Sequence, residues 1–131
     1  MRYLVDADWL IDAFIGRPDA VRTLDYLSPE GLAVSIIAVA ELYEGAFGTP
    51  DPSPTLAAFR EFLRGYAILP LTDPAAVRFA QVRATLRQQG QLIPDMDLLI
   101  AATAMEADLT LLTRNLRHFT RISDLRLYQP S

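Results

Sequence analysis

Short apolar runs alternate with longer amphipathic segments along this chain of 131 residues. Four runs, at 3–5, 32–35, 67–69 and 109–113, are rich in Leu, Val and Ile and end at or beside a polar residue or Pro, which predicts buried β-strands; 126–128 predicts a fifth. The periodicity of the segments between them predicts helices over 8–14, 18–27, 36–47, 55–65, 73–89 and 95–107.

Local punctuation supports these limits. Asp6 or Asp8 can cap the first helix, Asp73-Pro74 starts a helix that Gly90 ends, and the Pro-rich stretch 48–54 predicts a loop between helices. Strands that alternate with helices predict a three-layer α/β/α domain with a central, mostly parallel sheet of four to five strands. The length fits one domain over 1–131.

Composition excludes several classes of protein. Hydrophobic residues make up 51% of the chain, so it is not a disordered one. The absence of Cys excludes disulfides, thiolate metal sites and a Cys nucleophile, and the absence of Lys excludes P-loop and Schiff-base chemistry. A net charge of −4 disfavours a generally basic nucleic-acid-binding surface. The start of the chain lacks a secretory pattern and the longest apolar stretch, 32–40, is half a membrane span, so we expect a cytoplasmic protein without a membrane segment.

Polar residues that follow the strands are the first candidates for a functional site, because ligands bind at the carboxyl ends of parallel strands. Asp6 and Asp8 follow the first strand and Asn115 follows the fourth. Asp6 taken by itself is more typical of a helix N-cap. Glu41 lies on an apolar helix face, where a carboxylate is rarely buried unless it is paired or binds a metal, whereas Glu44 fits a solvated position.

Asp95 and Asp97 open the last long helix, which is more acid than capping requires. Asp95 fits the N-cap position, and Asp97 is then free to face a ligand. Carboxylates that converge repel one another, and a hard cation such as Mg2+ or Mn2+ would relieve this. The single His, His118, is interpreted as a surface or packing residue.

Four segments together resemble the PIN-domain family, and within it the VapC-type toxins of bacterial toxin–antitoxin pairs. They are 3–8, 40–46, 93–102 and 112–125, in the family's order and over essentially the whole chain. The resemblance implies three metal-binding acids, a fourth polar position and a supporting hydroxyl, which fall on Asp6, Glu41, Asp97 (with Asp95 as the alternative), Asn115 and Thr113. Two departures are an Asn at the fourth position instead of Asp, and His118 where an acid usually precedes the Phe.

The resemblance implies an Mg2+- or Mn2+-dependent endoribonuclease that acts as the toxin of such a pair. It also implies a cognate VapB-type antitoxin and a homodimer. RNA phosphates would need flanking cations, for which Arg83, Arg87, Arg114 and Arg117 are the candidates.

Three other functions remain open at this point. Asp6-Ala7-Asp8 fits the Asp-x-Asp of haloacid-dehalogenase-like phosphatases, but Leu10 stands where they carry Thr or Val, and the length leaves no room for a cap. A phospho-receiver domain normally needs a Lys after its last strand. An inactive PIN-like binding module would lack one of the acids, whereas Asp6, Glu41 and Asp97 are all present.

Overall fold

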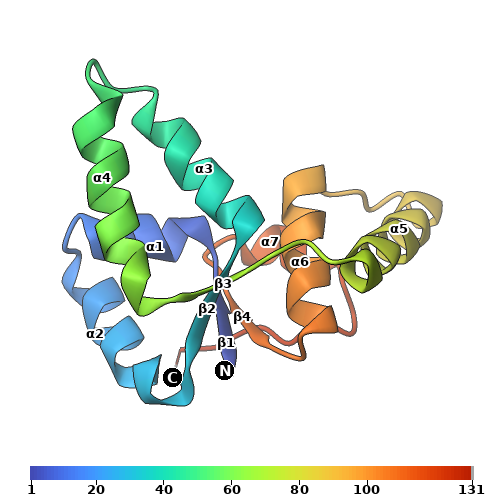
Figure 1. Ribbon diagram of the computed structural model, residues 1–131. Helices are drawn as coiled ribbons and strands as arrows, with labels where there is room; N and C mark the ends of the chain where they lie inside the picture. Colours follow the sequence, from blue (N-terminus) through green and yellow to red (C-terminus); the bar gives the residue numbers. More distant parts are fainter. Residues whose placement is uncertain (131) are drawn as a thin grey trace.

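The computed structural model describes residues 1–130 and contains a four-stranded parallel sheet (Figure 1). The strands are β1 (Tyr3–Val5), β2 (Leu32–Ser35), β3 (Ala67–Leu69) and β4 (Thr110–Leu112), in the order β3-β2-β1-β4. β1 pairs with β4 through Tyr3–Thr110, Leu4–Leu111 and Val5–Leu112. The first and the last strand of the chain are therefore neighbours, with β1 inside the sheet and β4 at its edge.

Helices connect the strands, as parallel pairing requires. The α-helices are α1 (Ala7–Phe14), α2 (Pro18–Leu27), α3 (Ile36–Ala46), α4 (Pro52–Phe62), α5 (Asp73–Gln88), α6 (Asp95–Glu106) and α7 (Leu116–Phe119). Two short 3-10 turns, Ser28–Glu30 and Leu63–Gly65, follow α2 and α4. No helix within residues 1–130 is both long and apolar enough to cross a bilayer.

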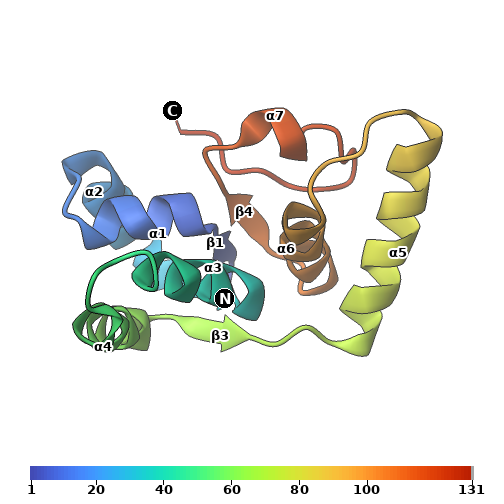
Figure 2. The ribbon, with the colours of Figure 1, turned by 90° about the horizontal axis from the view of Figure 1, so that it is seen from above.

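The sheet is covered on both faces. All residues of β1 and β2 are buried, and since neighbouring side chains in a strand point to opposite faces, both faces must be packed. Figure 2 shows α1 and α2 on one side of the sheet and α5 and α6 on the other. The core includes Leu10, Leu42, Leu98 and Phe119, each at most 1% exposed. The predicted three-layer fold is thus confirmed.

The strand order fixes where a ligand site can form. The chain moves from β1 to β2 to β3 in one direction and then returns to place β4 on the other side of β1. The carboxyl ends of β1 and β4 therefore flank the point where the strand order reverses, which is where α/β sheets bind ligands. Asp6 directly follows β1 and Thr113 directly follows β4.

Several predicted limits were wrong in informative ways. The segment 126–128 forms only an isolated parallel bridge between Leu127 and Leu111 instead of a fifth strand. The Pro-rich loop ends earlier than predicted, because α4 begins at Pro52, a residue that needs no N–H partner in a first helical turn. The short helix α7 was not predicted at all.

Candidate active site

Asp6 is both a helix cap and a buried acid. It is 6% exposed, its Oδ1 accepts a hydrogen bond from the Ala7 amide at 2.8 Å, and its Oδ2 accepts one from Thr113 Oγ1 at 2.8 Å. The Asp6 amide itself donates to the Leu112 carbonyl at 2.8 Å. These bonds hold the carboxylate between the ends of β1 and β4.

Asp8 belongs to the same group of acids, although the sequence did not single it out as a ligand. Its Oδ1 accepts from the Trp9 amide at 2.7 Å and its Oδ2 accepts from the Arg114 amide at 2.9 Å. Thr113 Oγ1 lies 3.4 Å from Asp8 Oδ2, but its one hydrogen serves the shorter contact to Asp6. The Asp-x-Asp spacing after a buried strand was the available signal for Asp8.

Burial and mutual repulsion make these carboxylates reluctant to ionise. Burial raises the pKa of Asp6 to about 7, with further contributions from the charges of Asp8 and Glu41, against the lowering effect of its hydrogen bonds. The pKa of Glu41 is raised by burial and then by the charges of Asp97 and Asp8. Asp6, Asp8, Glu41 and Asp97 therefore form one electrostatically coupled cluster, called the acidic cluster below.

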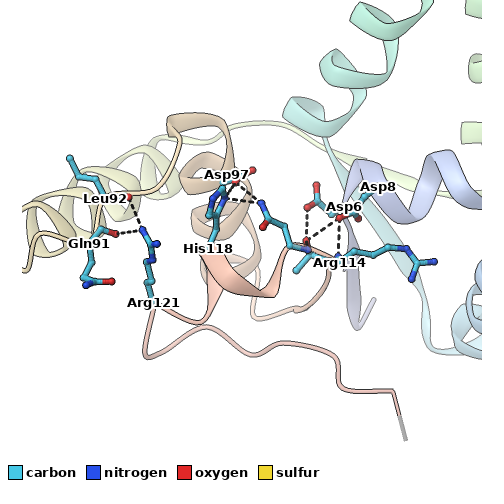
Figure 3. A network of polar contacts seen from close by, with 10 residues as sticks. Asp6, Asp8, Gln91, Leu92, Asp97, Arg114, His118 and Arg121 are labelled. Atoms are coloured by element: carbon cyan, nitrogen blue, oxygen red, sulfur yellow. Dashed lines mark hydrogen bonds and ion pairs between the residues drawn. The ribbon is translucent and has the colours of Figure 1, made fainter.

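His118 is a partner of this cluster, and its interpretation as a surface or packing residue was wrong. Its Nδ1 lies 2.7 Å from Asp97 Oδ2 and 2.7 Å from Asn115 Nδ2 (Figure 3). Asn115 Nδ2 also lies 3.4 Å from Asp97 Oδ2. The sequence could not reveal this because α7, which carries His118, packs against α6 only in the folded chain.

The acids at the start of α6 differ in their surroundings. Pro94, not Asp95, occupies the N-cap position, so the predicted capping role of Asp95 was wrong. Asp95 is the first helical residue, is 62% exposed and pairs with Arg83 Nε at 2.9 Å. Asp97 is only 16% exposed and lies in the acidic cluster. This contrast favours Asp97 over Asp95 as the third acid.

Two of the four arginines expected to hold RNA have partners within the protein. Arg114 Nε bonds Asp12 at 2.7 Å, its NH2 group bonds Asp19 at 3.0 Å, and its guanidinium stacks 4.0 Å from the centre of the Trp9 ring. Arg83 is the partner of Asp95, as described above. Arg87 and Arg117 are exposed and make no ion pair within residues 1–130.

The acidic cluster has the chemistry of a hard-cation site but is not closed around one. Among residues 1–130, no three acidic or imidazole side chains converge in a metal-binding arrangement. Asp97 uses only Oδ2 in its hydrogen bonds, and the carboxylate of Glu41 has no hydrogen-bond donor in this part of the chain. Oxygen donors that repel one another and keep free lone pairs fit Mg2+ or Mn2+.

Comparisons with known proteins identify relatives of this chain. The family model described as PIN domain matches residues 3–125. Ribonuclease VapC2 of Haemophilus influenzae is 34% identical over 126 residues, which cover 96% of each chain. The tRNA(fMet)-specific endonuclease VapC of Salmonella typhimurium is 28% identical over 127 residues, covering 97% of this chain and 96% of the relative.

Solved structures extend the similarity to the fold. The crystal structure of VapBC2 from Rickettsia felis, bound to a DNA fragment from the promoter, matches with a TM-score of 0.89 at 28% identity over 98% of both chains. This chain therefore belongs to the PIN-domain family, within its VapC group. The alternatives of a haloacid-dehalogenase-like phosphatase and a phospho-receiver domain are thereby set aside.

Proposed function

We propose that this protein is a metal-dependent endoribonuclease and the toxin of a VapBC-type toxin–antitoxin pair. The observation that carries the proposal is the acidic cluster at the switch point of the sheet, in a chain whose relatives are described as ribonucleases. Such a cluster is unfavourable without a cation, so a structural role for it is a poor explanation. An inactive PIN-like binding module would not need to retain these acids.

In this proposal Asp6 and Asp97 would hold Mg2+ or Mn2+, and Glu41 would hold a second ion or position the attacking water. The chemistry supplied by such an ion, when bound, would be to polarise the phosphate and to lower the pKa of a water molecule for attack on phosphorus. Thr113 orients Asp6 through its 2.8 Å hydrogen bond. Asn115 would orient the site from beside Asp97, since its side-chain amide lies 3.4 Å from Asp97 Oδ2 and 2.7 Å from His118 Nδ1.

RNA has to approach an acidic surface, so unpaired cations near it matter most. Arg87 and Arg117 are exposed and have no acidic partner within residues 1–130, which makes them the preferred phosphate contacts. Arg83 can contribute if a phosphate replaces Asp95. Arg114 is held by Asp12 and Asp19, so its main effect is to order the loop after β4.

The proposal has wider consequences for the organisation, location and partners of the protein. We propose one PIN domain over residues 1–131, a cytoplasmic location, a VapB-type antitoxin as partner and a homodimer. The similarity of this chain to the structure of VapBC2 from Rickettsia felis supports the proposal that its partner is an antitoxin.

The test is cleavage of RNA by the purified protein with Mg2+, with Mn2+ and with excess EDTA. We expect cleavage only with a divalent ion. Asp97→Asn should reduce the rate more than about 100-fold, since loss of even an outer partner of a metal ligand typically costs 10–100-fold. Asp95→Asn should retain most activity because Asp95 is exposed and paired with Arg83.

The exposed Glu44 supplies the matched control, since Glu44→Gln removes a carboxylate from the helix of Glu41 without touching the acidic cluster. Glu44→Gln should cleave like the unmodified protein. Cleavage that persists undiminished in EDTA, or a larger loss in Asp95→Asn than in Asp97→Asn, would contradict the proposed site. Absence of any cleavage would favour a PIN-like binding module.

A further inference from the structure

The contact between His118 and Asp97 constrains which ring nitrogen carries a hydrogen. An ionised Asp97 only accepts hydrogen bonds, so Nδ1 at 2.7 Å from its Oδ2 must be a donor. A lone pair on Nδ1 would instead face the carboxylate oxygen directly and be repelled by it. The contact therefore requires a hydrogen on Nδ1 of His118.

Asn115 adds to this arrangement once its amide is oriented correctly. The side-chain nitrogen of Asn115 lies 2.7 Å from His118 Nδ1. If Nδ1 carries a hydrogen, this orientation of the amide sets two hydrogen-bond donors against each other. The amide oxygen and nitrogen have nearly the same shape, and their assignment follows from the hydrogen-bond network. With the amide oxygen toward the ring, Nδ1–H has two acceptors, Asp97 and Asn115.

His118 is held in place by α7, and the chain that directly follows this residue is fixed by two contacts. Phe119 is fully buried in the core. Arg121 donates to the carbonyl of Leu92 at 2.9 Å and lies 3.4 Å from the carbonyl of Gln91, which joins the end of α7 to the loop before α6 (Figure 3). The imidazole, 28% exposed, thus meets Asp97 from a supported position.

We infer that His118 is a positioning residue that holds Asp97 Oδ2 through Nδ1–H and leaves Oδ1 for the ligand of the site. This inference rests on the proposed role of Asp97. With the Asn115 amide in this orientation, His118 is the one hydrogen-bond donor to Asp97 Oδ2 within residues 1–130, and Oδ1 has none. Outer partners of this kind typically change metal affinity or activity by 10–100-fold.

The first test reads the hydrogen directly. His118 is the only His in the chain, so its ring gives one unambiguous set of signals in a long-range 1H–15N NMR spectrum. We expect Nδ1 to show the shift of a nitrogen that carries hydrogen. In Asp97→Leu, which removes the charged acceptor and leaves the Asn115 amide free to turn its NH2 group toward the ring, the hydrogen should move to Nε2, the usual tautomer in water. A wild-type ring with a bare Nδ1 would overturn the inference, whether or not the protein cleaves RNA.

The second test separates positioning from packing by comparing three substitutions of one residue. His118→Asn keeps an N–H where Nδ1 lies, His118→Gln places its amide at the reach of Nε2, and His118→Ala removes the donor. Mn2+ binding is measured from the EPR signal of the free ion, alongside single-turnover RNA cleavage and the melting temperature. We expect His118→Gln and His118→Ala to lose 10–100-fold in Mn2+ affinity and rate, and His118→Asn to stay within about threefold.

The outcomes are distinct from those for the proposed function. A His118→Ala protein that binds Mn2+ and cleaves like wild type would overturn the positioning role, as would a His118→Asn protein as impaired as His118→Ala. If the wild type neither binds Mn2+ nor cleaves RNA, the proposed function fails, while the NMR measurement still decides the contact between His118 and Asp97.

Discussion

Replacing Asp6 by Asn should stabilise the metal-free protein at pH 8, although Asp6 is a buried helix cap. The carboxyl group has a pKa near 3.8 when solvated and about 7 in the fold. A difference of roughly three pH units, at about 1.4 kcal/mol per unit, makes the ionised side chain unfavourable in the fold by about 4 kcal/mol, an upper bound for the gain. Asn carries no charge and retains an oxygen that can accept from the Ala7 amide.

The sign of the pH dependence follows from the raised pKa. Between about pH 4 and 7 the unfolded chain has released the Asp6 proton while the folded chain keeps it, so the free energy of unfolding falls as the pH rises through this window. The gain of Asp6→Asn should therefore be small at pH 4, grow up to pH 7 and then level off.

Urea unfolding of both proteins from pH 4 to pH 8, in EDTA, measures this difference. A gain of about 2 kcal/mol would raise the melting temperature by several degrees for a domain of this size. Glu44→Gln, which removes an exposed carboxylate, should show no comparable gain. Since Asn is as good a cap as Asp, an Asp6→Asn protein that is less stable than the wild type at pH 8 would refute the electrostatic reasoning.

Three further predictions concern the same site. Thr113→Val should cost about 1–3 kcal/mol in unfolding free energy because Asp6 Oδ2 loses its donor, whereas Thr113→Ser should restore it; equal losses would contradict a hydrogen-bond effect. Arg114→Ala should destabilise by about 1–2 kcal/mol through its lost ion pairs and its stacking on Trp9, while weakening RNA binding less than Arg117→Ala in filter binding; the reverse ranking would make Arg114 a direct phosphate contact. Mg2+ at about 100 times its Kd should stabilise the wild type by about 2.7 kcal/mol in a thermal melt and Asp97→Asn much less; equal shifts would place the cation elsewhere.

The sequence was informative about the elements and about the acids, because both leave local signals. Buried parallel strands read as continuous apolar runs, so 32–35 and 67–69 were predicted with their observed bounds as β2 and β3. Glu41 was predicted to be a site residue because a carboxylate on an apolar helix face is unusual. The pKa of Glu41 is raised by burial. The catalytic and RNA-binding roles of these residues remain predictions.

Local sequence patterns were least informative for short elements and for residues whose contacts are distant in the sequence. The apolar triplet 126–128 looked like a strand, yet it meets the sheet only at the bridge between Leu127 and Leu111. A four-residue helix such as α7 has no periodicity to detect. Arg114 was predicted to be free to bind RNA. Its ion-pair partners, Asp12 and Asp19, are about a hundred residues away in the sequence, so no local pattern indicates them.

Hydrophobic periodicity is a property of neighbouring residues, so the sequence was enough to predict that apolar strands alternate with helices and that acidic or polar residues follow the strand ends. Which of those residues meet depends on the folded chain. Thr113 bonds Asp6, 107 positions away, because the strand order β3-β2-β1-β4 brings the first and last strands together. His118 meets Asp97 because α7 packs against α6. Such pairings depend on strand order and helix packing, which follow from the burial of the whole core and not from any local pattern.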